Sequence, residues 1–459
     1  EMQRSLVGSE MCIRDSAKPL PSARKLAYQA LYDILEKKAY ANLTLQHVLK
    51  EYPLNGPESR LLTELVYGVL RKYNYLLWII SRLSTYSLKK IHPSVKILLC
   101  LGLYQLLYLS RIPASAAVNE TVKIAKKITH KGNVGFINAI LRGYIRKKKE
   151  LALFPRNDNP LLYDSLYWNE PEWLVKWWQS HYSREAASIL EAFNETPKLA
   201  VRVNTLKTNR DALQKMMAEK GIKTEAVPWD NNALILSEGA HAFWPLAEEG
   251  LAYVQSLSSM IPAAVLSPKE GDRVLDMCAA PGSKTTQMAE MMKNNGTIDA
   301  WDLYPHKISL IKNNAKKLGI SIIHAGARDS GKPFPALFGR YDKVLLDAPC
   351  SGLGVLSHKP EIRWHRKEED LNEFPPLQEK LLSCAASYVK EGGLLVYSTC
   401  TLNPAENEDR VRQFLKEHQE FTPLEFSLGD QKKSADGMMT ILPYELHSDG
   451  FFIAKLLKK

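Results

Sequence analysis

Hydrophobic residues recur at helical spacing through the first third of the chain. From Ser22 onward, one such stripe consists of Leu26, Ala30, Leu31, Ile34 and Leu35. Comparable stripes continue over residues 61–70, 95–109, 116–128 and 134–145. Apolar positions three and four residues apart form one face of an amphipathic helix, so the pattern predicts an all-α bundle over residues 22–150.

A helical linker is predicted over residues 151–198, with two further helical stretches. The linker contains four tryptophans, which are Trp168, Trp173, Trp177 and Trp178. Tryptophans at this spacing more often pack a core than stack on RNA bases. We therefore expect them to fill the junction between domains.

The hydrophobic pattern changes at residue 199. Short apolar segments at 199–203, 224–227 and 233–236 predict strands, and a helix is predicted over 209–220. This predicts a small α+β subdomain over residues 199–262, which we expect to bind RNA. After Pro268, apolar strands alternate with amphipathic helices, which is typical of a doubly wound, Rossmann-like α/β domain; we place it at residues 263–459. Its expected strands are 273–276, 297–302, 321–324, 343–346 and 394–397, with a closing hairpin that ends in 451–456.

Composition narrows the possible partners and surroundings. The 459 residues carry a net charge of +11 and the pI is near 9.1, which favours a nucleic-acid partner, although solvated lysine faces would give the same count. No apolar run is long enough to span a bilayer. The six cysteines form neither a paired secretory framework nor a CxxC zinc pattern, so we expect a cytoplasmic protein without a metal. Residues 1–21 are set aside as a disordered or foreign tail.

Candidate chemistry begins where the first strand of the α/β domain ends. Asp276 opens the turn DMCAAPGSKT, which leads into a helix over 284–293, and Asp302 ends the second strand. A glycine turn at a helix N-terminus admits a charged ligand, and an acid after the second strand accepts ribose hydroxyls. The two acids together favour a nucleoside-containing cofactor, with Asp329 as a contact to its adenine. The alternatives are a purely structural turn and a helix N-cap at Asp302.

Two cysteines follow the next two strands. The fourth strand leads into Asp347-Ala-Pro-Cys350, and the fifth leads into Ser-Thr-Cys400. Carboxyl ends of parallel strands meet at one edge of a sheet, so both thiols should face one cleft. A lone buried cysteine is usually a small hydrophobe, but two cysteines beside an acid indicate thiol chemistry.

These motifs resemble a known family. The segments CAAPGSKT, DAPCSGLG, HKPEIRW, YSTCTLNPAENE and DGFF occur in the order found in RNA cytosine-C5 methyltransferases of the NOL1/NOP2/Sun group, and the resemblance covers residues 199–459. The helical segments ARKLAYQALYDIL, TELVYGVLRKY, LGLYQLLYL, IPASAAVNETVKIAK and FINAILR resemble the NusB-type RNA-binding domain.

The resemblance implies a role for each matched position. Cys400 matches the nucleophile that adds to cytosine C6, and Cys350 matches the cysteine that assists product release, as a base or through a water. Asp347 is a further catalytic candidate that offsets charge on the ring. The positions that match the S-adenosylmethionine site are Cys278, Ala279, Ala280, Pro281, Gly282, Ser283, Lys284, Asp302, Asp329 and Asp347. Ser283 departs from a frequent glycine, and Asp329 matches only with a shifted register.

The resulting hypothesis is a monomeric enzyme that methylates cytosine C5 in 16S (small-subunit) ribosomal RNA. The NusB-like domain favours this substrate by analogy alone. The alternatives are a transfer RNA or another ribosomal RNA site, and a non-catalytic NusB-like RNA-binding protein. A thiol redox enzyme using Cys350 and Cys400 is disfavoured because the CxxC motif is missing and Asp302 would have no function.

Overall fold

The computed structural model describes residues 21–151 and 156–459, so nearly all of the predicted tail lies outside the described residues. The chain divides into two compact units, residues 1–152 and residues 153–459. Among the described residues, no helix is both long and apolar enough to cross a membrane.

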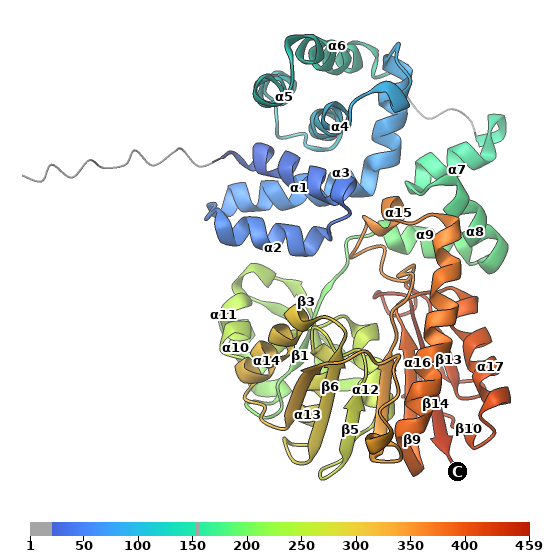
Figure 1. The fold of residues 1–459 in the computed structure, drawn as a ribbon. Helices are drawn as coiled ribbons and strands as arrows, with labels where there is room; N and C mark the ends of the chain where they lie inside the picture. Colours follow the sequence, from blue (N-terminus) through green and yellow to red (C-terminus); the bar gives the residue numbers. More distant parts are fainter. Residues whose placement is uncertain (1–20, 152–155) are drawn as a thin grey trace, which may run out of the picture. The chain divides into compact units, whose positions relative to one another are not determined.

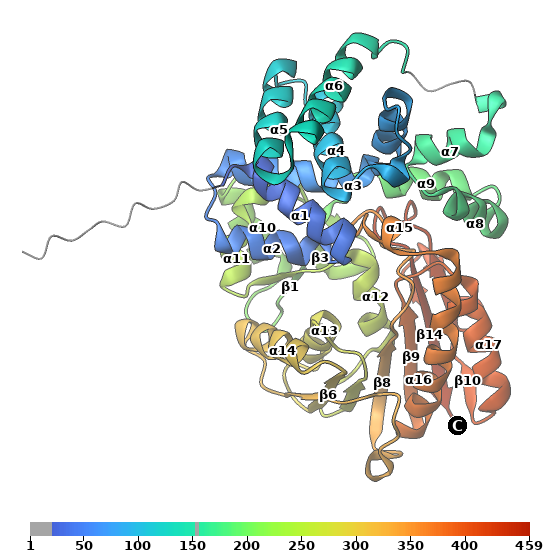
Figure 2. The same cartoon turned by 45° about the horizontal axis from the view of Figure 1, so that its top comes forward.

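The first unit is the predicted helical bundle (Figures 1 and 2). Its helices are α1 (Ala23–Lys37), α2 (Ala41–Glu51), α3 (Gly56–Leu83), α4 (Pro93–Tyr108), α5 (Ala114–Ile128) and α6 (Lys131–Lys147), with a short 3-10 turn η1 (Leu88–Lys90). Helix α4 is buried on all sides because α1, α3, α5 and α6 pack around it. Helix α2 was not predicted, since its apolar stripe has only three buried residues, Ala41, Leu45 and Val48.

The second unit begins with α7 (Pro160–Trp168), α8 (Glu172–Tyr182) and α9 (Ala186–Asn194). The prediction of two helical stretches was wrong here. Asn169 and Ser183 have positive φ angles of 54° and 40°, and these residues separate the three helices. Trp177 and Trp178 are buried in a cluster with residues of the following α/β domain, which agrees with the predicted packing role of the tryptophans.

A small antiparallel sheet follows, with the strand order β2-β3-β1-β4. The strands are β1 (Leu199–Val203), β2 (Lys223–Val227), β3 (Asp230–Glu238) and β4 (Ala252–Val254), and the accompanying helices are α10 (Arg210–Glu219) and α11 (Trp244–Glu248). The predicted strands are all present, and β4 is an addition of three residues.

The large sheet has the order β10-β14-β9-β8-β5-β6-β7, and β13 pairs with β14. Its strands are β5 (Arg273–Asp276), β6 (Thr297–Asp302), β7 (Ile323–Ala327), β8 (Tyr341–Asp347), β9 (Val389–Thr399), β10 (Phe421–Pro423), β13 (Met438–Ile441) and β14 (Phe451–Lys458). Strands β5 to β9 are parallel, and β14 joins β9 antiparallel. Strand β7 begins at Ile323, two residues later than predicted, and it extends to Ala327 through the segment HAGA, which has little hydrophobic pattern.

Helices cover both faces of this sheet, as predicted for a doubly wound domain. On strand β8, Val344 and Leu346 pack with α16 (Phe374–Tyr388) and α17 (Glu408–Glu417), whereas Leu345 packs with α12 (Leu257–Leu266), α13 (Ser283–Met291) and α14 (Pro305–Leu318). The strand order reverses between β5 and β8, and such a switch point opens a crevice at the carboxyl ends of the strands.

Candidate active site

The two predicted cysteines meet at this crevice. Strands β8 and β9 are parallel neighbours, with Asp347 opposite Ser398, so the loops after them leave the sheet side by side. The Sγ atoms of Cys350 and Cys400 are 3.4 Å apart, which is a hydrogen-bonding distance, and both cysteines are free thiols.

The two thiols have opposite pKa shifts. The hydrogen bond from Cys350 lowers the pKa of Cys400, assisted by the charges of Lys359 and Lys284 and opposed by burial and by Asp347. The same bond raises the pKa of Cys350, and burial and the negative charge of Cys400 add to the shift. Cys400 is therefore the more acidic thiol of the pair and Cys350 the less acidic one.

Buried polar side chains hold the two cysteine loops together. The hydroxyl groups of Ser351 and Thr401 are 2.7 Å apart, so the residues that follow the two cysteines are joined directly. The buried Glu406 carboxylate accepts hydrogen bonds from the Ser351 N–H and from Gln378, both at 2.9 Å. Asn407 accepts a bond from Thr399 and donates one to the Thr401 carbonyl. The motif NPAEN thus positions the cysteines.

The backbone of Gly354 joins the segments DAPCSGLG and DGFF to the Cys400 loop. Its N–H donates to the Cys400 carbonyl at 3.0 Å, and its own carbonyl accepts from the Gly450 N–H at 2.7 Å. A Cβ atom at position 354 would lie 2.0 Å from the Gly450 carbonyl oxygen. Only glycine fits there, and the segments DAPCSGLG and DGFF are joined at this point.

Lys284 links the turn after β5 to the end of β8. Its Nζ donates to Asp347 at 2.8 Å and to the Ser259 hydroxyl at 3.1 Å. The second carboxylate oxygen of Asp347 accepts a hydrogen bond of 2.8 Å from Ser398. Both oxygens of Asp347 are thus engaged, and its carboxylate is held beside the cysteine pair.

Asp276 carries an unsatisfied buried oxygen. Its Oδ2 accepts a hydrogen bond of 2.7 Å from Thr285, whereas its Oδ1 has no partner among the described residues. Burial raises the pKa of Asp276 to about 7, with Thr285 acting against the shift. A buried carboxylate oxygen in a cleft marks a place for a ligand with a donor or a positive charge.

A cavity of about 270 Å³ lies among these groups. Its lining residues are Ser256, Ser259, Asp276, Cys278, Ala279, Ala280, Pro281, Ser283, Lys284, Asp347, Val355, His358, Lys359, Cys400, Asp449 and Phe451. Most of the predicted site residues therefore share one cavity. Among the described residues, no group of three or more His, Cys, Asp or Glu side chains is arranged to hold a metal ion.

Two predicted acids lie outside the lining of this cavity. Asp302 is the last residue of β6. A hydrogen bond of 2.7 Å from the Ala279 N–H to the Trp301 carbonyl holds this strand end next to the turn after β5. The carboxylate of Asp302 accepts a hydrogen bond from the Tyr304 N–H. Asp329 uses its carboxylate within its own loop, where it accepts from the Gly331 N–H at 3.0 Å and lies 3.6 Å from Lys332. The structure does not bring the Asp329 side chain into the cavity.

Several residues of the site were not assigned from the sequence. His358, Lys359 and Asp449 belong to the motifs HKPEIRW and DGFF, which were the available signal. Arg202 on β1 had no sequence signal, yet its buried guanidinium forms a two-point ion pair with Glu290 at 2.9 and 3.0 Å and donates to the Ser283 carbonyl at 2.9 Å. It thereby anchors α13, whose first turn contains Ser283 and Lys284.

Comparison with known proteins gives this site a context. Residues 263–457 match the family described as 16S rRNA methyltransferase RsmB/F, residues 21–146 match the NusB family, and residues 170–242 match an RsmF/B-like ferredoxin-like domain. A Bacillus subtilis protein described as probable ribosomal RNA small subunit methyltransferase B is 39% identical over 447 residues, which cover 95% of this chain and 99% of that protein.

Solved structures show the same architecture. The crystal structure of PH0851 aligns with a TM-score of 0.82 and 27% identity over 96% of this chain and 100% of that chain. The structure of NSun6 from Pyrococcus horikoshii with SFG aligns with a TM-score of 0.56 and 25% identity over 63% of this chain and 98% of its own. Since identity extends along nearly the whole of both chains, this protein belongs to the ribosomal RNA small subunit methyltransferase B family.

Proposed function

We propose that the protein uses S-adenosylmethionine to methylate C5 of a cytosine in 16S ribosomal RNA, through a covalent bond between Cys400 and C6. The observation that carries the proposal is the thiol pair, in which the sulfur atoms of Cys350 and Cys400 are 3.4 Å apart at the carboxyl ends of β8 and β9, beside the switch point of the sheet. The family of the chain and the names of its relatives support an RNA substrate.

The chemistry of cytosine explains why a thiolate is needed. C5 is a poor nucleophile, and addition of Cys400 to C6 makes C5 enamine-like, so that one difficult step becomes two easier ones. The lowered pKa of Cys400 favours it over Cys350 as the attacking group. The target base must be unpaired or flipped out for the sulfur to reach C6.

The residues around the cavity fit the proposed cofactor. S-adenosylmethionine, when bound, supplies an electrophilic methyl group on a sulfonium. The unsatisfied Oδ1 of Asp276 suits a cationic group such as the amino group of its methionine part. We assign its binding to residues 278–284 with Asp302 and Asp347; Asp329 stays a proposal that needs its loop to rearrange.

Cys350 and Asp347 receive separate roles. The Cys350 thiol is placed to donate a hydrogen bond to the sulfur of Cys400 when Cys400 leaves as a thiolate. Asp347 is proposed to offset charge that develops on the cytosine ring, for example by sharing a proton with N3. Lys284 and Ser398 each donate to one oxygen of Asp347, and a carboxylate oxygen can accept a second hydrogen bond, so this contact is compatible with both bonds.

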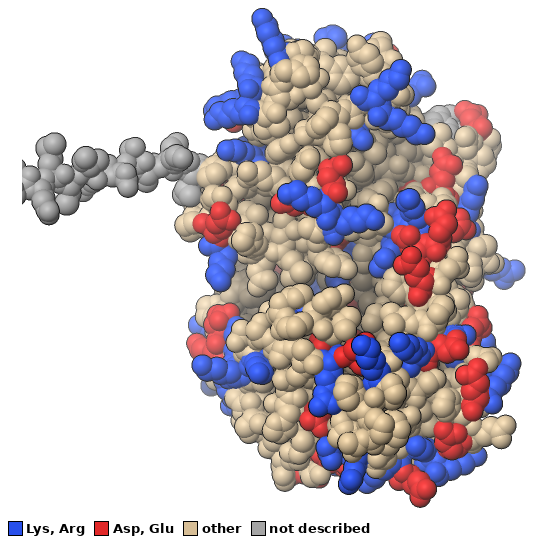
Figure 3. Space-filling view, viewed as in Figure 1, with Lys and Arg blue, Asp and Glu red and all other residues tan. Residues whose placement is uncertain are grey.

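The helical unit is proposed to hold the RNA. Residues 22–150 contain 22 Lys and Arg against seven Asp and Glu, whereas residues 151–459 contain 36 against 40. The net positive charge therefore resides in this unit, and Figure 3 shows its Lys and Arg side chains on the surface. Such charge binds phosphates through release of counterions.

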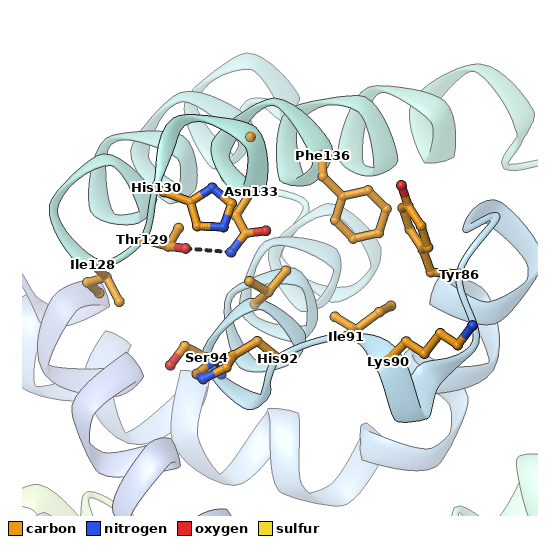
Figure 4. A pocket seen from close by; sticks show the side chains of 12 residues that line it. Tyr86, Lys90, Ile91, His92, Ser94, Ile128, Thr129, His130, Asn133 and Phe136 are labelled. Carbon is orange, nitrogen blue, oxygen red and sulfur yellow. Dashed lines mark hydrogen bonds between the residues drawn. The ribbon is translucent and has the colours of Figure 1, made fainter.

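A cavity of about 730 Å³ in the helical unit fits the same role (Figure 4). None of the described residues that line it is acidic, and they include Lys90, His92 and His130. Tyr86 and Phe136 lie beside it with their rings 5.8 Å apart, edge to face. Basic groups next to aromatic rings are suited to a single-stranded RNA segment.

The test is methylation of small-subunit ribosomal RNA transcribed in vitro, with labelled S-adenosylmethionine and bisulfite sequencing of the product. We expect one protected cytosine that is lost in Cys400→Ala and kept in the matched control Cys384→Ala, because Cys384 is buried in α16 away from the cavity. Label in transfer RNA alone would overturn the substrate. Label in neither RNA would favour the non-catalytic RNA-binding alternative.

A further inference from the structure

A histidine and an aspartate form a pair inside the cavity that holds Cys400. Nδ1 of His358 lies 2.6 Å from Oδ1 of Asp449, and both residues line the cavity together with Cys400 and Lys284. The Asp449 side chain is 7% exposed and that of His358 is 38% exposed. Neither residue has a role in the proposed attack of Cys400 or in the proposed release of its thiolate.

Backbone hydrogen bonds place this pair relative to Cys400. The N–H groups of His358 and Lys359 both donate to the Val355 carbonyl, at 3.1 and 2.8 Å, which forms a tight turn after Gly354. Gly354 itself bonds the Cys400 carbonyl on one side and the Gly450 N–H on the other. The turn that carries His358 and the loop that carries Asp449 therefore share one anchor with the nucleophile.

The proposed reaction needs a proton acceptor that the cysteine pair does not provide. After C5 is methylated it still carries its hydrogen, and the bond from C6 to Cys400 cannot break until that proton leaves. In the free protein the contact with Cys400 raises the pKa of Cys350, and burial and the charges of Glu406 and Asp347 raise it further. Burial and these carboxylates are still present when Cys400 is bonded to C6, so Cys350 keeps its proton and is a poor acceptor. A general base with an imidazole ring suits neutral pH better.

The contact with Asp449 prepares His358 for this task. A carboxylate only accepts hydrogen bonds, so Nδ1 of the ring carries a hydrogen. In the neutral ring that the proposed base requires, the lone pair is then on Nε2. The other charged groups that line the cavity are Lys284, Lys359, Asp276 and Asp347. Lys284 is paired with Asp347, and Asp276 bonds to Thr285.

We infer that His358, oriented by Asp449, is the base that removes the C5 proton from the methylated adduct; this inference rests on the function proposed above. The C5–H bond breaks and its proton moves to Nε2 of His358. The electron pair forms the C5=C6 double bond, the C6–S bond breaks, and its electrons return to Cys400 as a thiolate. The partly exposed imidazole then passes the proton to water, and Cys350 donates to the released thiolate.

The experiment compares the wild type with His358→Asn in single turnovers on RNA that carries tritium at cytosine C5. Asparagine keeps a donor near the position of Nδ1 and hence the bond to Asp449, but it lacks a base at the position of Nε2. We expect methyl transfer into a protein–RNA adduct to proceed, tritium release to fall about 100-fold, and the adduct to accumulate on denaturing gels. His324→Asn, on the exposed edge strand β7, is the matched control and should release tritium like the wild type.

The outcomes separate the inference from the proposed function. The proposed function would be defeated if the wild type released no tritium and if Cys400→Ala methylated the RNA as well as the wild type does. Wild-type release together with undiminished release in His358→Asn would overturn the role of His358 alone. Asp449→Asn gives a second test, since it removes the group that fixes the ring without touching the ring; its release rate should lie between those of the wild type and His358→Asn, and an unchanged rate would also count against the pair.

Discussion

The buried ion pair between Arg202 and Glu290 makes the strongest prediction about stability. Their side chains are 2% and 4% exposed, and the guanidinium also donates to the Thr286 hydroxyl and the Ser283 carbonyl. Arg202→Met would leave the Glu290 carboxylate buried without its partner. Removing one member of a buried pair costs about 3–5 kcal/mol, and we expect a loss of this size in the free energy of unfolding.

The double variant Arg202→Met with Glu290→Leu isolates the cause. Replacing both charges with apolar side chains of similar volume is often neutral, so this variant should recover most of the stability lost in Arg202→Met. The wild type and both variants would be unfolded in urea and followed by tryptophan fluorescence, which reports on the second unit because eight of the nine tryptophans belong to it.

The same variants test whether the pair positions the cofactor turn. Arg202 bonds the carbonyl of Ser283, which precedes Lys284 on α13, so Arg202→Met should also weaken S-adenosylmethionine binding in calorimetry. Arg210→Met, on the partly exposed start of α10, is the control. The reasoning would be refuted if Arg202→Met lowered the free energy of unfolding by less than about 1 kcal/mol, which is the size expected for an exposed ion pair. It would also be refuted if the double variant recovered none of the lost stability.

Three further predictions follow from the site and the helical unit. Cys350→Ala should accumulate a covalent RNA adduct on denaturing gels, because the departing Cys400 thiolate loses its donor; normal turnover without trapped RNA would contradict the two-cysteine scheme. Because burial raises the pKa of Asp276 to about 7, its carboxylate becomes charged as the pH rises through 7. Calorimetry should then show tighter S-adenosylmethionine binding from pH 6 to 8, and a pH dependence that persists in Asp276→Asn would exclude this cause. In the protein without cofactor, the same shift makes folding less favourable as the pH rises. The folded state keeps a proton on Asp276 up to about pH 7, whereas the unfolded state loses it near the ordinary pKa of 3.8, so the free energy of unfolding falls between about pH 4 and pH 7. Removing residues 1–145 should weaken RNA binding and leave cofactor binding intact, and unchanged RNA affinity would refute the role of the helical unit.

Much of the fold could be predicted because its signals are local. The alternation of apolar strands with amphipathic helices depends on periods of two and 3.6 residues, and these periods located β5 and β6 to the residue. The failures occurred where the local signal is weak. The break at Ser183 is a single backbone angle without glycine or proline, and β7 is an edge strand with little hydrophobic pattern.

The sequence by itself determined which chemistry the site can hold. Asp276 ends a predicted strand, and Asp347, Cys350 and Cys400 follow predicted strands; parallel strands bring their carboxyl ends to one edge of the sheet. This rule is topological, so it needs no knowledge of side-chain contacts. It could not orient Asp329, whose carboxylate depends on the local path of its loop.

Only the tertiary structure decided which of the two thiols has the lowered pKa and which distant groups contact them. His358 and Asp449 are 91 residues apart in the chain and Arg202 and Glu290 are 88 apart, so no local period relates the partners. The pKa order of Cys350 and Cys400 depends on a contact of 3.4 Å and on the charges of Lys359 and Lys284 nearby. Such interactions fall off steeply with distance and vary with burial, and both quantities exist only once the chain has packed.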